Sequence, residues 1–374
     1  MIYWIALFAV EFILFYLYNK SHSIKRKQKI LWCIIFCLVY FSGFRDGLGM
    51  DYTGYQQLCE RQSFIDKALF LSEPLTLGLQ AFCYNTFFSA VIYFVISSFL
   101  VCALSLITYS KFENFTLAAF VFVFFTDIYL SSMNIVSQFA AGGIILIGYY
   151  PYIKDNSKKN LYIAIGSVFL GMFIHLSSIF MLIPLAFKRS KNSSTDILIW
   201  ILLIVASFFI PIDLLFKIPF VGNIIEYLDY TNYTSYNVSG ISKLSTTNIY
   251  MHLLLIPFIL KYNAIKKRKD ADEYIYLIKM YAIYLIMYNF STGNLTITYR
   301  LACFFVLFIP LLLAKLPNIV GKSVAYFLIV FPMLILLSFR LATGDRLTVP
   351  TRILPIESIV DQYYNPYQNP DADF

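Results

Sequence analysis

The chain has 374 residues, of which 59% are hydrophobic and 13% are charged, and its mean hydropathy is +0.70. These values exclude an ordinary soluble core and predict an all-α polytopic membrane protein, with 1–374 as a single integral membrane domain. The net charge of +8 does not indicate nucleic acid, because the basic residues lie in short clusters between apolar runs.

Ten apolar segments have the length of a membrane crossing or of a large part of one. In chain order the predicted spans are 1–18, 30–44, 87–108, 115–130, 135–150, 197–215, 249–260, 275–290, 301–314 and 324–341. A further apolar segment, 161–187, is long for one crossing and has lysines on both sides. The sequence therefore predicts about 10 to 11 transmembrane helices, which leave no room for a soluble catalytic domain.

The basic residues are divided unequally between alternating gaps. One set of gaps holds 19 of the 29 Lys and Arg residues, and it comprises 19–29, 109–114, 151–160, 188–194, 261–274 and 315–322. Because loops rich in Lys and Arg stay in the cytoplasm, this set should be the inner one. The N-terminus, the outer loop 45–86, the Tyr-rich outer loop 216–248 and the C-terminal tail 342–374 then face outward.

Segment 161–187 fits this orientation only if both of its lysine-rich flanks are cytoplasmic. We therefore expect it to enter the membrane and return as a re-entrant hairpin of two short helices, with the turn near His175. The alternative is one long tilted helix, which would reverse the direction of every later segment. The outer loops are expected to form the roof of an active site.

The two sides also differ in the kind of basic residue they carry. Of the 19 inner charges 16 are Lys, whereas six of the nine outer ones are Arg. Insertion does not distinguish Lys from Arg, but a planar forked donor suits phosphate oxygens. Arg45, Arg300 and Arg340 lie at the outer boundary of their spans and could face one diphosphate. The alternative is that each side chain extends to lipid headgroups.

The segment that follows the second predicted span is the densest motif in the chain. It places Gly47 and Gly49, which allow a tight turn, between Arg45 and Asp51. Asp51 offers an acceptor or a base, and the nearby Tyr52 and Tyr55 offer flat faces for sugar rings. A structural turn capped by Asp51 is the alternative. Glu73 and Pro74 then precede an amphipathic stretch, 75–82, that could lie along the outer surface.

His175 is the one histidine away from loops and helix boundaries, and Ser177 and Ser178 follow it. An imidazole at this depth is either a hydrogen-bonded core group or a catalyst. In loop 216–248 a tyrosine recurs every third residue, at Tyr227, Tyr230, Tyr233 and Tyr236. On a helix these rings would form one stripe, suited to carbohydrate stacking or to an interfacial belt.

Several attractive patterns carry no chemistry. Asp270 and Asp272 form a D-x-D pattern, but they follow a lysine cluster in an inner loop and indicate solvated surface. The six cysteines show no metal spacing, and no P-loop or G-x-S-x-G motif is present. Cys59 and Cys83 are the two cysteines that could meet outside the membrane, and the sequence leaves open whether they pair.

Taken together, the motifs resemble the EpsG-like branch of the Wzy-type polysaccharide polymerases. The resemblance rests on Arg45, Gly49, Asp51, Tyr52, Tyr55, Glu73 with Pro74, His175 with Ser177, Arg300 at the head of a late span, and a terminal Pro-Tyr element. One position departs from the family, which often has Arg-Gln at the head of its middle span. This chain has Ser137 and Gln138 there.

The resemblance implies a bacterial enzyme of the inner membrane, with both termini in the periplasm. It would join oligosaccharide repeat units carried on undecaprenyl diphosphate at the periplasmic face, as a metal-independent glycosyltransferase without cofactors. Its partners would be the lipid-linked donor and acceptor and the bilayer, with a chain-length regulator and a flippase as further candidates, and no nucleic acid. The product could be the O-antigen of lipopolysaccharide, capsule or exopolysaccharide.

In this scheme the residues have distinct roles. Arg45, Arg300 and Arg340 would hold the diphosphate, and Asp51 or His175 would activate the acceptor hydroxyl. The predicted sugar contacts are Tyr52, Tyr55, Glu73, Tyr230 and Tyr233. Two alternative functions remain: a flippase for the same lipid-linked oligosaccharide, and a membrane acyltransferase that modifies a surface polysaccharide.

Overall fold

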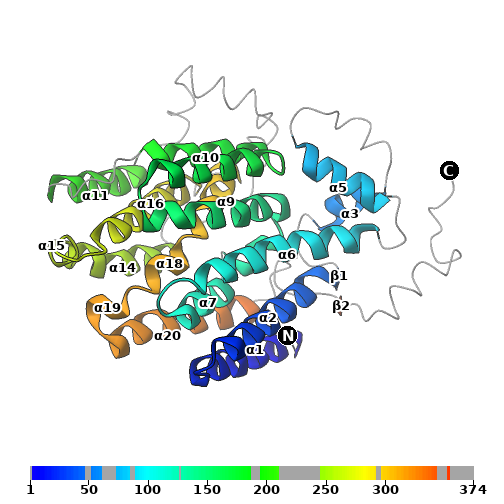
Figure 1. The fold of residues 1–374 in the computed structure, drawn as a ribbon, viewed down its shortest axis with the longest axis horizontal. Helices are drawn as coiled ribbons and strands as arrows, with labels where there is room; N and C mark the ends of the chain where they lie inside the picture. Colours follow the sequence, from blue (N-terminus) through cyan, green and yellow to red (C-terminus); the bar gives the residue numbers. More distant parts are fainter. Residues whose placement is uncertain are drawn as a thin grey trace, which may run out of the picture.

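The protein is described by a computed structural model, in which 2–46, 52–60, 73–84, 89–125, 128–186, 194–209, 245–291, 296–342 and 352–353 are placed. These residues are helical apart from loops and one antiparallel pairing of two short strands. Strand β1 (Arg45–Asp46) pairs with β2 (Arg352–Ile353), so that Arg45 lies opposite Ile353. This pairing brings the chain after the second helix next to the C-terminal region (Figure 1).

The first half of the chain contains helices α1 (Ile2–Lys20), α2 (Ile24–Gly43), α3 (Tyr52–Glu60), α5 (Pro74–Tyr84), α6 (Ser89–Tyr109), α7 (Phe115–Phe124), α8 (Tyr129–Ser132), α9 (Val136–Lys154) and α10 (Lys158–Met172). The second half contains the 3-10 helix η1 (Leu176–Ala186) and helices α11 (Ser194–Phe209), α14 (Thr246–Leu260), α15 (Tyr262–Ile265), α16 (Ala271–Ser291), α17 (Thr296–Val306), α18 (Ile309–Leu313), α19 (Pro317–Val320) and α20 (Lys322–Ala342).

Two described helical segments, Ala90–Tyr109 and Lys322–Phe339, are long and apolar enough to cross a membrane. Two further segments, Thr298–Val306 and Ile309–Val320, meet at an angle of 43° and add a third crossing if they are counted together. Among the placed residues, shorter apolar helices include α7, η1, α11 and α14. The prediction of an all-α membrane protein is confirmed, whereas the full number of 10 to 11 crossings stays a prediction.

Helix α7 differs from the expected span 115–130, because it ends at Phe124 and every one of its residues is buried. A helix that is apolar on all sides belongs inside a bundle. Helix α1 packs beside it, and the rings of Phe8 and Phe124 lie 4.7 Å apart. The apolar run that the sequence assigns to a membrane span therefore forms part of the core.

Helix α9 lies in the centre of the bundle, between α6 and α10 (Figure 1). Its 19 residues correspond to about 28 Å, close to the thickness of the hydrocarbon core. Two of its glycines allow this close packing. A Cβ atom at Gly143 would lie 2.7 Å from the carbonyl oxygen of Leu100, and one at Gly148 would overlap the side chain of Ser167.

The chain reverses direction inside segment 161–187. Helix α10 runs antiparallel to α9, since Asn160 donates to the carbonyl of Pro151 near its start, and Gly171 lies against Ile145 near its end. Phe173, Ile174 and His175 then break the helix. The following helix η1 runs back along α9: Ser177 is near Gln138, and the carbonyl of Met181 accepts from Tyr149. The break lies where the sequence predicts a turn. A re-entrant position in the bilayer stays a prediction.

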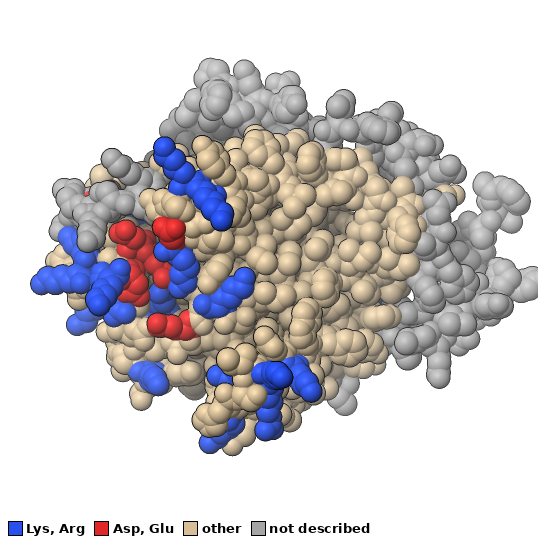
Figure 2. Space-filling model, viewed as in Figure 1, with Lys and Arg blue, Asp and Glu red and all other residues tan. Residues whose placement is uncertain are grey.

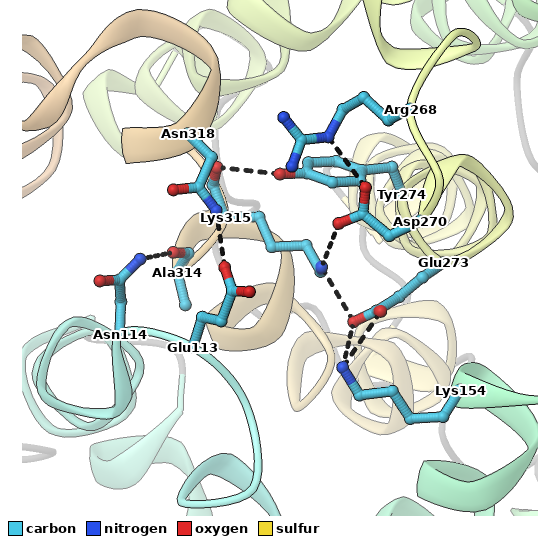
Figure 3. Close-up of polar contacts among 10 residues, drawn as sticks. All are labelled: Glu113, Asn114, Lys154, Arg268, Asp270, Glu273, Tyr274, Ala314, Lys315 and Asn318. Carbon is cyan, nitrogen blue, oxygen red and sulfur yellow. Dashed lines mark hydrogen bonds and ion pairs between the residues drawn. The ribbon is translucent and has the colours of Figure 1, made fainter.

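The end of α9 that carries Lys154 lies in a network of charged side chains (Figure 3). Lys154 donates to both carboxylate oxygens of Glu273, at 3.0 and 3.1 Å. Lys315 also reaches Glu273, at 3.0 Å, and contacts Asp270 at 3.4 Å. Arg268 completes the network through a 2.9 Å bond to Asp270. These residues come from three gaps that the sequence assigns to one side.

The charged side chains on the surface are also concentrated toward this end of the molecule. Figure 2 shows that the charged side chains visible on one face gather toward α15, α19 and the start of α2, whereas the described surface toward α3 and α5 shows none. The lysine-rich gaps that the structure describes, which leave out 188–193, therefore meet at one end of the molecule, as the alternating count predicts. That this end is cytoplasmic stays a prediction.

Candidate functional site

A cavity of about 120 Å³ lies at the other end of α9, where that helix begins. Its walls come from α3, α5, α9, α17 and the break after α10, so segments far apart in the sequence meet there. Most of the lining side chains are polar or charged. The lining residues are Tyr55, Glu73, Thr76, Gln80, Ile135, Ser137, Gln138, His175 and Arg300.

The start of α5 is fastened to the break after α10. The backbone N–H of Leu75 donates to the carbonyl of Phe173 at 2.8 Å, and the hydroxyl of Thr76 donates to the carbonyl of Ile174 at 2.6 Å. Glu73, directly before the helix, accepts from the backbone N–H of Leu176 at 3.2 Å. The three bonds satisfy backbone groups that the break leaves outside a helix, and they fix one wall of the cavity.

Glu73 and His175 form a hydrogen-bonded pair in the cavity wall. The Glu73 carboxylate contacts Nδ1 of His175. Among the described residues, the other ring nitrogen, Nε2, is buried and has no hydrogen-bond partner. The ring of Phe304 lies nearly parallel to the imidazole, with its centroid 6.5 Å away. With Nδ1–H donated to a carboxylate, Nε2 carries the lone pair and is available to accept a proton.

Arg300 and Gln138 also line the cavity. The side-chain amide of Gln138 donates to the backbone carbonyl of Arg300 at 3.3 Å and to the hydroxyl of Ser177 at 3.2 Å. Next to it, the Ser137 hydroxyl is 2.9 Å from that of Tyr93. The position where the family often has Arg-Gln therefore lies on the cavity wall. Here it contributes a hydroxyl and an amide, while Arg300 contributes the positive charge.

Arg45 is completely covered and does not line the cavity. Its guanidinium donates to the carbonyl of Ser42 and, at 2.8 Å, to that of Met133, and it lies 4.2 Å from the centre of the Phe94 ring. These contacts join the end of α2 to the turn before α9. The geometry favours an anchoring role for this side chain over a contact with a ligand in the cavity.

The two tyrosines of the densest motif occupy different environments. Tyr52 is buried and stacks on Phe94, with the ring centroids 5.0 Å apart. Tyr55 stacks on Tyr93 at 5.5 Å, is only partly buried, and lines the cavity. Of the two rings, Tyr55 is therefore the one placed to contact a ligand.

The predicted site residues fall into three groups. Arg300, His175, Glu73 and Tyr55 are brought together in one cavity, whereas Arg45 and Tyr52 lie behind its wall. Arg340 belongs to the last turn of α20, and its side chain lies outside the described residues. Asp51, Tyr230 and Tyr233, with most of loop 216–248 and of the C-terminal tail, also lie outside them.

Thr76, Gln80 and Gln138 also line the cavity, although the sequence did not assign a role to any of them. A signal for the first two exists: they are four residues apart in the amphipathic stretch 75–82 and so share one helix face. Gln138 was noted only as part of a departure from the family pattern. Within the described residues, no three His, Cys, Asp or Glu side chains are grouped to hold a metal ion.

Comparison with known families matches residues 28–358 to the profile of the EpsG family. The matched region contains every residue that lines the cavity, from Tyr55 to Arg300. No curated protein and no solved structure matches the chain. The match covers most of the sequence and confirms the resemblance drawn from its motifs, so the chain belongs to the EpsG family.

Proposed function

We propose that this protein polymerises oligosaccharide repeat units carried on undecaprenyl diphosphate, at the periplasmic face of the bacterial inner membrane. Membership of the EpsG family supports a polysaccharide polymerase-like role. The observation that carries the proposal is the shared cavity of Arg300 and the Glu73–His175 pair. A glycosyl transfer from a lipid diphosphate needs a positive charge for the departing group and a base for the acceptor, and these residues supply both.

The transfer forms one bond and breaks one. Nε2 of His175 takes the proton of an acceptor sugar hydroxyl as its oxygen attacks the anomeric carbon of the growing chain. The bond from that carbon to the lipid diphosphate breaks, and the electron pair leaves with the diphosphate. Glu73 stabilises the imidazolium that forms and keeps its ring in place, because it is hydrogen-bonded to Nδ1. Glu73 therefore acts by positioning His175 and not as the sugar contact first expected.

The departing diphosphate is held by Arg300, which is the charged donor among the cavity residues. A guanidinium can bind two phosphate oxygens at once, and each charge-assisted bond is stronger than a neutral one. Arg340 would approach from the end of α20. We assign Arg45 to support of the wall, because its donors are directed at two main-chain carbonyls.

The sugars are contacted by the remaining cavity residues. Tyr55 offers a ring face, and Thr76, Gln80 and Gln138 offer hydroxyl and amide groups. Tyr230 and Tyr233 would add ring faces from the outer loop. In the bilayer, α10 and η1 would form the re-entrant hairpin, with both termini of the protein on the periplasmic side.

The assignment of Arg300 is tested by Arg300→Ala. Arg300→Lys separates the effect of the positive charge from that of the bidentate guanidinium geometry. We expect Arg300→Ala to abolish polymer and to leave single lipid-linked repeat units on the outer side, while the protein is present at normal levels. Arg300→Lys should keep partial activity, because one charge remains without bidentate geometry. Arg268→Ala, in the charged network at the other end, is the matched control.

The same analysis of lipid-linked intermediates separates the alternative functions. Loss of a flippase would strand the repeat units on the inner side, and loss of an acyltransferase would change decoration and leave chain length unaltered. Polymer of wild-type length in Arg300→Ala cells would rule out the assignment of the diphosphate to Arg300.

A further inference from the structure

Two cysteine thiols meet between α3 and α5, the helices that form the outer part of the cavity wall. Cys59 lies in the last turn of α3 and Cys83 near the end of α5, and both are completely buried. The thiol of Cys83 hydrogen-bonds that of Cys59 and also contacts the backbone of Tyr93. Both cysteines belong to a small hydrophobic cluster with Tyr52, Phe94 and Val136, separate from the main core.

This arrangement meets the first requirement for a disulfide, which is that the two side chains point at each other across a short gap. The hydrogen bond from Cys59 lowers the pKa of the Cys83 thiol, although burial opposes this effect. A thiol with a lowered pKa is more readily present as the nucleophilic thiolate. The other four cysteines lie in predicted spans, where they act as small apolar side chains.

We propose that Cys59 and Cys83 form a disulfide in the mature protein, which joins α3 to α5 over the cavity. The proposal rests on the outward orientation of segment 45–86 that the proposed function also requires, since disulfides persist in oxidising compartments. The oxidant is a disulfide-bearing thiol oxidase of that compartment. It would act as the segment emerges, before α3 and α5 bury the two thiols.

The disulfide forms in two thiol–disulfide exchange steps. The Cys83 thiolate attacks one sulfur of the oxidant's disulfide and forms a mixed disulfide, and the oxidant's other sulfur leaves as a thiolate. The Cys59 thiolate then attacks Cys83 sulfur and displaces the oxidant. The two cysteines lose two electrons and two protons, and the oxidant gains both as two thiols.

The bond would control the geometry of the site. Tyr55 is on α3, while Thr76 and Gln80 are on α5, and Glu73 lies directly before it. All but Tyr55 lie inside the ring that a bond between Cys59 and Cys83 would close. Closing this ring restricts the unfolded chain and fixes the distance between two cavity walls. It also holds the start of α5 against the break at His175.

The proposal is tested by counting free thiols. Membranes prepared without reductant are denatured with a thiol-alkylating reagent, and the intact protein is weighed by mass spectrometry. We expect four of the six cysteines to be alkylated, and all six after reduction. Peptide mapping should recover the crosslink between Cys59 and Cys83. Six alkylated cysteines without reduction would overturn the proposal.

Variants make the count specific. Cys33→Ser removes a thiol that is exposed on α2, and it should leave three alkylated cysteines, because the pair stays intact. Cys59→Ser should leave five, because Cys83 then has no partner. If only three cysteines are alkylated in Cys59→Ser, the disulfide joins two other cysteines and the proposal is overturned.

A stability measurement gives an independent readout. Reductant should lower the Tm of the wild type by about 5 °C and leave the Tm of Cys59→Ala/Cys83→Ala unchanged. An equal shift in both proteins would overturn the proposal. Thiol counts and Tm are read from the protein and not from the glycan. Failure of this proposal is therefore distinguishable from failure of the polymerase assignment.

Discussion

The two ends of helix α9 use charged residues in opposite ways. At the Lys154 end, the ammonium groups of Lys154 and Lys315 both bind the carboxylate of Glu273 (Figure 3). At the Val136 end, Arg300 and His175 line a cavity, and among the described residues Nε2 of His175 is a buried atom without a hydrogen-bond partner. The first arrangement holds helices together, and the second gathers polar side chains around a cavity.

The difference has an energetic meaning. The side chains of Lys315 and Glu273 are only 5% and 8% exposed, so each depends on its partner to offset the loss of water. A buried polar atom without a hydrogen-bond partner, such as Nε2 of His175 among the described residues, is unusual. Under the proposed function, bound substrate would supply that partner. Variants at the cavity should therefore lower activity, and variants in the network should lower stability.

The largest effect is expected for His175→Ala. Removal of a general base lowers the rate of transfer by about 10²- to 10⁴-fold, while the folded protein remains. Polymer formation in membranes supplied with lipid-linked repeat units gives the rate, and thermal unfolding in detergent gives the stability. Glu73→Gln should lower the rate less, because the imidazole remains and loses only the carboxylate that stabilises its charged form.

Asp51→Asn is the comparison for that experiment, since the sequence offers Asp51 as the other base. Loss of activity in Asp51→Asn with full activity in His175→Ala would move the base to Asp51. If both variants keep wild-type rates, the base lies elsewhere in the chain.

The second effect concerns the network. Glu273→Gln leaves Lys315 buried with Asp270 as its remaining carboxylate, at 3.4 Å, and should destabilise the protein by about 3 kcal/mol. Asp272→Asn is the control, because this neighbouring carboxylate is exposed. Thermal unfolding measures both. Activity per folded molecule should stay at the wild-type level in both variants, and a selective loss of activity in Glu273→Gln would break the contrast between the two ends.

Arg45→Lys tests a residue that lies at the cavity end of α9. Like the residues of the charged network, Arg45 is buried and is bonded to other groups of the protein. Lysine cannot keep both carbonyl bonds and the contact with Phe94, so we expect a loss of about 2 kcal/mol of stability. Arg26→Lys, on the exposed start of α2, should have no effect. Loss of polymer in Arg45→Lys with unchanged stability would instead place Arg45 on the diphosphate.

Much of the site could be predicted from the sequence because chemistry limits which residues can stand in an apolar segment. A histidine inside 161–187 and an arginine at the head of 301–314 are costly there, and both line the cavity. The family resemblance implied that both belong to one site, but the residue pattern alone does not bring them together, since their meeting depends on how the chain folds around the break at Phe173 and Ile174.

The contacts of Arg45 and Glu73 could also not be predicted from the sequence. Both are polar residues next to apolar runs, and the pattern alone favours a ligand for each. The contacts differ: Arg45 donates to main-chain carbonyls that a hydropathy pattern does not reveal, and Glu73 faces a histidine more than a hundred positions away. Hydropathy also does not reveal that α7 is buried on all sides, because an apolar run looks the same whether it faces lipid or the protein core.

The smallest effect is the pH dependence of the network. Burial alone would raise the pKa of Asp270, but the hydrogen bond from Arg268 and the charge of Lys315 together lower it below its usual 3.8. A lowered folded-state pKa stabilises the protein above the unfolded-state pKa, and this contribution is lost as the pH falls through the folded-state pKa. Because Asp270 is partly exposed, the contribution stays below about 1 kcal/mol. The Tm difference between wild type and Asp270→Asn should therefore be small at pH 7 and vanish below about pH 3. A difference that grows on acidification would mean that Asp270 is not held ionised by its basic neighbours, and that this end of α9 is stabilised by packing alone.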